Sequence, residues 1–119
     1  MTRRSATLTD LRDALRRFAA ARDWEQFHTP KNLAMALAVE AAELLEYFQW
    51  LTPTQSTHLD ARMRRAVADE IADVLLYLTR LADVLGIDPL AAARRKIRVN
   101  ARKYPVGRAK GHARKYSEL

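Results

Sequence analysis

Apolar side chains recur every three or four residues along most of the chain, which is the spacing of one face of an α-helix. This pattern predicts helices over residues 8–22, from Pro30 to about residue 50, from about residue 66 to Gly86, and over residues 89–103. Residues 54–65 are polar, and they either open the third helix early or form a loop. Four amphipathic helices joined by short connections predict an all-α fold with a four-helix bundle core.

Residues at the expected helix ends support these limits. Thr7 is a candidate N-cap, and Pro30 suits a first helical turn, where its missing N–H is not needed. Gly86 is a typical stop residue, and Asp88-Pro89 combines an N-cap acid with proline at the first helical position.

The composition is that of one small globular domain. The chain has 119 residues, 49% of them hydrophobic, with only three glycines and four prolines, which favours long helices over a turn-rich β fold. It has no cysteine, which excludes disulfides, thiolate metal sites and a cysteine nucleophile. No apolar run is long enough to cross a membrane, so a cytoplasmic protein without membrane contact is expected.

Positive charge is concentrated near the C-terminus. The formal net charge is +7, and from Arg94 onward there are ten Lys and Arg residues against one acid, Glu118. The preceding residues hold eleven basic and thirteen acidic side chains. We therefore interpret residues 1–105 as the domain and residues 106–119 as a basic tail, which either binds phosphates or nucleic acid or is merely solvated.

Two pairs of acids lie within the most apolar parts of the predicted helices. Glu40 and Glu43 are three residues apart, as are Glu70 and Asp73, so each pair shares one helix face. Tyr77 continues the face of Glu70 and Asp73 one turn after Asp73. Acids beside an apolar stripe are unfavourable unless a cation neutralises them, which predicts a metal site. The alternative is that both pairs lie on ordinary solvated faces.

The residue types favour one class of metal. All three histidines, His28, His58 and His112, lie outside the acidic pairs, unlike the Glu-x-x-His pattern of di-iron bundles. An all-oxygen ligand set suits Mg²⁺, with Mn²⁺ as an alternative, better than iron or zinc.

Aromatic and basic residues suggest contacts for the rest of a ligand. Trp24, His28 and Trp50 lie near helix ends that would bound the metal site, where a nucleobase could stack on them; the alternative is that both tryptophans are core residues. Lys96, Asn100, Arg102, Lys103 and Tyr104 follow one another at the end of the fourth helix and would complement a polyphosphate. Cations there are equally expected as partners of the helix dipole.

These motifs together resemble a known family. Glu40-x-x-Glu43, twenty-six residues and then Glu70-x-x-Asp73 resembles the metal-binding signature of the MazG-like, all-α nucleotide pyrophosphohydrolases. Residues 22–28, 48–50 and 96–105 are similar to the dCTP pyrophosphatase branch of that family. The resemblance extends from Leu8 to Pro105.

The resemblance implies an enzyme that cleaves dCTP, or a related or 5-modified dNTP, between the α and β phosphates, in nucleotide pool control or sanitation. It implies a homodimer or homotetramer, Mg²⁺ as cofactor, and four catalytic, metal-binding acids: Glu40, Glu43, Glu70 and Asp73. It further implies base contacts from Trp24, His28 and Trp50, sugar or base contacts from Tyr77 and Asn100, and phosphate contacts from Lys96 and Arg102.

One residue departs from the pattern, and two other interpretations stay open. Animal members of the branch resemble this chain but have a histidine where it has Leu15, which bears on base preference. A nucleic-acid-binding module using the basic C-terminal segment would leave the paired acids unexplained, so nucleic acid is not the expected partner. A catalytically inactive regulatory module is the second alternative.

Overall fold

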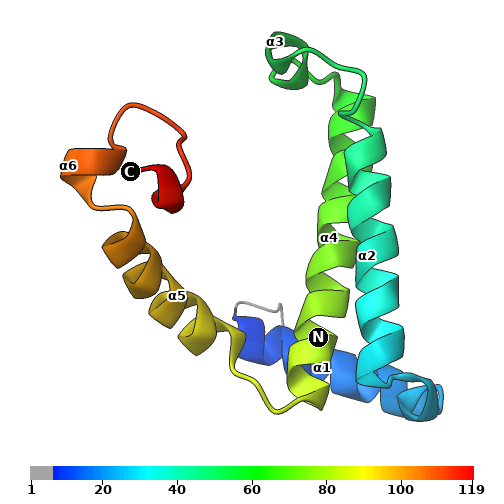
Figure 1. Cartoon of the computed structure of the whole chain (residues 1–119). Helices are drawn as coiled ribbons and strands as arrows, with labels where there is room; N and C mark the ends of the chain where they lie inside the picture. Colours follow the sequence, from blue (N-terminus) through cyan, green and yellow to red (C-terminus); the bar gives the residue numbers. More distant parts are fainter. Residues whose placement is uncertain (1–6) are drawn as a thin grey trace. The chain divides into compact units, whose positions relative to one another are not determined.

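The computed structural model describes residues 7–119 and is built from helices (Figure 1). The long helices are α1 (Leu8–Ala21), α2 (Pro30–Glu46), α4 (Ala61–Val84) and α5 (Pro89–Lys103). Shorter elements are the 3₁₀ turns η1 (Glu25–Phe27) and η2 (Tyr116–Glu118) and the one-turn helices α3 (Pro53–Ser56) and α6 (Val106–Ala109). No strand occurs within residues 7–119, and the predicted all-α class is confirmed.

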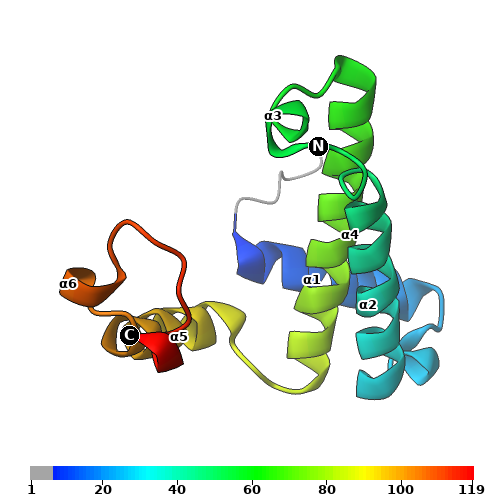
Figure 2. The ribbon, with the colours of Figure 1, turned by 45° about the horizontal axis from the view of Figure 1, so that its top comes forward.

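The chain divides into two compact units, Met1–Gly86 and Ile87–Leu119. In the first unit α2 and α4 run side by side in opposite directions, and α1 lies across the end where α2 begins and α4 finishes (Figures 1 and 2). The buried apolar core comes from all three helices: Ala19, Leu33, Val67 and Ala82. Two of these four are alanines, one on α1 and one on α4, and such small side chains let packed helices approach closely.

Side-chain caps define where the helices begin. Thr7 accepts a hydrogen bond from the N–H of Asp10 (3.0 Å), and Thr29 accepts one from Asn32 (3.2 Å) just before Pro30. Asp88 accepts from two backbone N–H groups of α5, at 3.0 and 3.1 Å. The predicted starts of these three helices are confirmed.

The stretch between α2 and α4, for which the apolar pattern allowed either a loop or an early helix start, contains a one-turn helix, α3. Thr52 and Gln55 form a complete capping box around α3, with hydrogen bonds of 3.0 and 3.1 Å. Asp60 then caps α4 through the N–H of Met63 (2.8 Å). The third long helix therefore begins at Ala61, so part of the polar stretch belongs to it.

The second unit contains α5, α6 and η2. Tyr104, at the end of α5, makes an edge-on contact with Tyr116 (ring centroids 5.9 Å apart), and the Lys103 ammonium lies 4.8 Å from the centre of the Tyr116 ring. These contacts connect residues 106–119 to α5, although that segment has no apolar periodicity. The division into a domain and a basic tail stays a prediction. Within residues 7–119, no helix has the length and apolar character that a bilayer crossing requires.

Candidate active site

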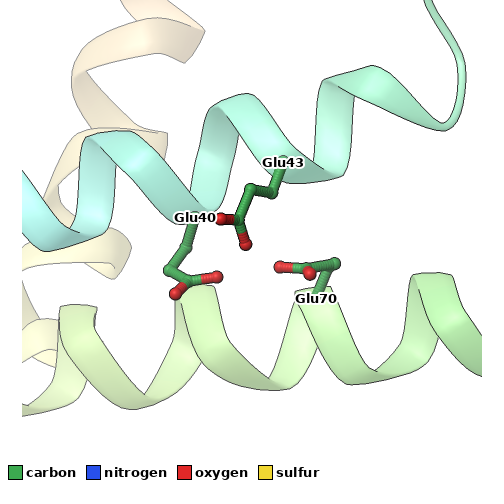
Figure 3. A group of neighbouring side chains, drawn as sticks. All are labelled: Glu40, Glu43 and Glu70. Atoms are coloured by element: carbon green, nitrogen blue, oxygen red, sulfur yellow. The ribbon is translucent and has the colours of Figure 1, made fainter.

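Three carboxylates converge between α2 and α4. Glu40 and Glu43 project from successive turns of α2 toward Glu70, which projects back from α4 (Figure 3). Each offers one oxygen, and the three oxygens lie within 4.8 Å of one another. The spacing of three residues aligns the first two acids on one face of α2, and the antiparallel packing of α4 places the third opposite them. We call Glu40, Glu43 and Glu70 the acidic triad.

Asp73, the fourth predicted acid, lies next to the triad without belonging to it. It follows Glu70 on α4 after three residues, and its charge is among the causes that raise the pKa of Glu40. Asp73 also lines a cavity of about 150 Å³ in the first unit. It therefore connects the acidic triad with that cavity.

Residues of α1, of the connection after it, and of α2 and α4 line this half-open cavity. Its wall is mostly apolar and aromatic with a few polar groups, which is the usual character of a small-molecule site. The lining residues are Leu15, Phe18, Trp24, His28, Leu33, Asp73, Leu76, Tyr77 and Arg80.

A tight turn at the end of α1 places the aromatic residues of this wall. Asp23 has a left-handed backbone (φ 53°), which Asp tolerates better than most residues, and the N–H of Trp24 donates to the carbonyl of Ala19 (3.0 Å). The Trp24 ring then meets Phe18 and His28 edge-on, with centroids 5.7 and 6.4 Å apart. The turn thus brings Trp24 and His28 to the same cavity.

Comparison with known proteins decides the family. Residues 35–119 match the MazG-like family. The chain is 44% identical over 115 residues to human dCTP pyrophosphatase 1, which covers 95% of this chain and 68% of the human protein. The chain belongs to the MazG-like family, in the dCTP pyrophosphatase branch.

Further relatives agree in sequence and in fold. Mouse dCTP pyrophosphatase 1 is 43% identical over 115 residues, covering 95% of this chain and 68% of the mouse protein. The crystal structure of a pyrophosphatase from Archaeoglobus fulgidus has a TM-score of 0.79 and 43% identity, and it covers 88% of this chain and 98% of that one. The fold of this chain is therefore also that of a solved pyrophosphatase.

The negative charges of the acidic triad lie close together without a basic side chain among the described residues to neutralise them. The Glu70 carboxyl, which hydrogen-bonds Glu40 when one of the two is protonated, raises the pKa of Glu40 most strongly, and burial raises it further. Glu40 in turn raises the pKa of Glu43, by a hydrogen bond and by its charge. No Lys, Arg or His within residues 7–119 forms an ion pair with the triad.

The orphaned oxygens of the triad fit a divalent cation. The Oε2 atoms of Glu40 and Glu70 are buried and have no hydrogen-bond partner among the residues that the structure describes. An unpartnered buried carboxylate oxygen is unfavourable unless a cation binds it. The atoms that could bind the cation are all carboxylate oxygens, the ligand type that hard divalent cations prefer. His58 and His112 do not belong to this group; they hydrogen-bond to the Thr54 and Arg108 carbonyls.

Metal binding to the triad should weaken as the pH falls. Because the pKa values of Glu40 and Glu43 are raised, protons compete with the cation, and the rise in melting temperature on adding Mg²⁺ should be larger near pH 8 than near pH 5. Without Mg²⁺, Glu40 and Glu43 hold their protons more tightly in the folded chain than in the unfolded chain. The stability that this gives the folded state is present at low pH and is lost as the pH rises through the raised pKa values of the two groups. Thermal melts with and without Mg²⁺ test both trends, and a Mg²⁺ effect that does not change with pH would contradict them.

A chain of polar contacts runs from His28 and Arg80 in the cavity wall to α1, and the sequence pattern did not predict it. Arg80 Nε donates to His28 Nδ1 (3.0 Å), and Arg80 also pairs with Asp83 one turn later on α4 (3.4 Å). Arg16 of α1 binds both carboxylate oxygens of Asp83, with Nε at 2.8 Å. Burial, followed by the charge of Arg80, lowers the pKa of His28. Arg16 is the main reason that the pKa of Asp83 is lowered.

The structure does not bring every predicted binding residue to the cavity. Tyr77, Trp24 and His28 line it, whereas Trp50 lies in the turn after α2 with 86% of its surface exposed. Three further predicted residues are exposed on α5 in the second unit: Lys96, Asn100 and Arg102. Leu15 contributes an apolar side chain to the cavity wall.

Proposed function

We propose that this MazG-like protein is a Mg²⁺-dependent nucleoside triphosphate pyrophosphohydrolase. Its proposed substrate is dCTP or a related dNTP, including 5-modified forms, and its products are the monophosphate and pyrophosphate. The acidic triad carries this proposal, because its three oxygens lie within 4.8 Å of one another and Asp73 joins it to a cavity lined by aromatic residues. The identity to the dCTP pyrophosphatases supports the choice of substrate. The cytoplasm, where such a substrate is found, is the proposed location.

The proposed mechanism needs no nucleophilic side chain. Mg²⁺ bound by Glu40, Glu43, Glu70 and Asp73 would neutralise phosphate oxygens and lower the pKa of the attacking water. Glu43, one of the three carboxylates of the acidic triad, is the proposed proton acceptor. The carboxylates would also fix the geometry of attack, since they come from two helices packed against each other.

The remaining contacts follow the shape of a nucleotide. Trp24, His28 and Tyr77 are proposed to hold the base and sugar in the cavity, with Leu15 as an apolar part of its wall. Lys96 and Arg102 are proposed to bind phosphates and Asn100 the sugar or base, which their exposure on α5 permits. Trp50 is proposed to cover the base from outside the cavity. Its high exposure leaves it free to do so.

We also propose that the working form is a homodimer or homotetramer. The helix pair α2–α4 leaves six large apolar side chains between 42% and 59% exposed: Met35, Val39, Leu45, Ile71, Leu75 and Leu78. Apolar exposure on this scale is typical of a surface that another protein covers. Light scattering of the purified protein tests the oligomer.

Product analysis tests the activity most directly. The purified protein is incubated with each dNTP and NTP, with Mg²⁺ or with EDTA, and the phosphate products are separated. We expect monophosphate and pyrophosphate from dCTP with Mg²⁺ and no turnover with EDTA. Release of orthophosphate and a diphosphate would show that a different bond is cleaved. No turnover, together with steeply salt-dependent DNA binding, would favour the nucleic-acid-binding alternative.

A further inference from the structure

The contact between Arg80 and His28 determines which His28 nitrogen carries the proton. A guanidinium group stays protonated and can only donate hydrogen bonds. Arg80 Nε lies 3.0 Å from His28 Nδ1, so Nδ1 must be the acceptor in that bond. In the neutral ring the proton is therefore on Nε2. Burial and the charge of Arg80 lower the pKa of His28, which favours the neutral ring.

Arg80 is itself held in place from two helices. Its side chain is 11% exposed and pairs with Asp83, which is 8% exposed. Arg16, from α1, binds the same carboxylate through two nitrogens, a geometry that restricts rotation of both groups. Arg80 therefore has little freedom to leave His28, and Arg16, Asp83 and Arg80 together form what we call the arginine relay.

The free nitrogen of His28 is available to a ligand. His28 lines the cavity, and within residues 7–119 its Nε2 has no hydrogen-bond partner. With Nδ1 occupied by Arg80, the ring can offer a ligand one N–H donor and no acceptor.

We propose that Arg80 is a positioning residue that fixes His28 as the Nε2–H tautomer, so that the cavity selects a base whose ring N3 is a hydrogen-bond acceptor. The inference rests on the proposed function, because it takes the cavity as the base site. Of the pyrimidines, cytosine has two adjacent acceptors, N3 and the 2-carbonyl, whereas thymine and uracil carry a proton on N3. Because the 2-carbonyl accepts in all three bases, the proposed discrimination is at N3: a donor placed there pairs with cytosine, whereas it meets the N3–H of thymine or uracil and leaves two donors unpaired.

The tautomer is measured directly by long-range ¹⁵N–¹H NMR on the full-length protein without substrate. His28 should show the Nε2–H pattern. His58 should show the opposite one, because its Nδ1 lies 2.8 Å from the Thr54 carbonyl and must donate to it. His58→Gln and His112→Gln variants assign the signals. In Arg80→Gln the Nδ1–H form of His28 should become detectable, since an amide can donate or accept.

Activity then tests the consequence for selectivity. In Arg80→Gln we expect the ratio of kcat/KM for dCTP to that for dTTP to fall about tenfold, mainly through KM for dCTP. Arg80→Lys should restore much of the ratio, because an ammonium group also only donates. Arg65→Gln is the matched control, since Arg65 is an exposed arginine on the same helix, and it should leave the ratio unchanged.

Two results would overturn different parts of the argument. A His28 that keeps its wild-type tautomer pattern in a folded Arg80→Gln, with an unchanged dCTP to dTTP ratio, would overturn the role of Arg80. A wild-type protein that turns over no nucleotide would overturn the proposed function, and with it the assignment of the cavity to a base.

Discussion

Substituting glutamine for Glu70 is expected to lower Mg²⁺-dependent kcat/KM for dCTP by at least ~100-fold. Glu70 is the member of the acidic triad that comes from α4, and its Oε2 is buried without a partner among residues 7–119. The amide keeps the size of the side chain but removes the charge that a divalent cation would bind. Steady-state kinetics with dCTP at several Mg²⁺ concentrations measure the loss.

The stability of the Glu70→Gln variant shows whether Glu70 serves metal binding or folding. The hydrogen bond with the Glu70 side chain is the largest cause of the raised pKa of Glu40, and a neutral amide can donate to Glu40 without repelling it, so the metal-free variant should be as stable as wild type or more stable. The melting temperature should also lose its response to Mg²⁺. Asp69→Asn is the matched control, an exposed carboxylate beside Glu70 on α4, and it should change neither activity nor the Mg²⁺ response. Near-wild-type activity in Glu70→Gln would rule out the triad as the metal site.

Local signals in the chain were enough to predict most of the fold. Threonine or aspartate followed by a periodic apolar pattern identified the starts of α1, α2 and α5, because a side-chain cap is a local interaction. The start of α4 was harder to place, since its first turn alternates Ala61 and Met63 with arginines and its first buried residue is Val67. The Thr52–Gln55 capping box has the recognisable pattern Thr-x-x-Gln, but the helix that it begins is only one turn long, so no apolar periodicity follows it.

The acidic triad could be predicted from the sequence, whereas the arginine relay could not. Glu40 and Glu43 are aligned by helix geometry alone, and an equivalent pair on a second apolar helix suggested a shared site. Arg16 and Asp83, in contrast, are 67 residues apart and meet only because α1 crosses α4. The sequence has many arginines, and charge alone does not show which of them finds a buried carboxylate. Predicting the relay would have required the helix packing first.

Leu33→Ala is expected to destabilise the first unit by about 2–5 kcal/mol. Leu33 is 2% exposed and is the largest fully buried side chain among residues 7–119, near the start of α2. The substitution removes its packing and leaves a void beside the cavity that Leu33 also lines. A loss of this size is a large fraction of the total stability of a small domain, typically about 5–15 kcal/mol. Urea unfolding measures it as a lower midpoint with an unchanged slope.

A matched leucine separates core packing from the proposed oligomer contact. Leu78 on α4 is 44% exposed, so Leu78→Ala should destabilise a dilute, dissociated protein much less than Leu33→Ala does. If copies of the chain cover Leu78, the loss in that variant should grow with protein concentration, because association stabilises the folded state by mass action. The loss in Leu33→Ala should be nearly independent of concentration, because Leu33 is buried within one chain. Equal losses in the two variants at every concentration would contradict both the core assignment of Leu33 and the exposed apolar surface on α2–α4.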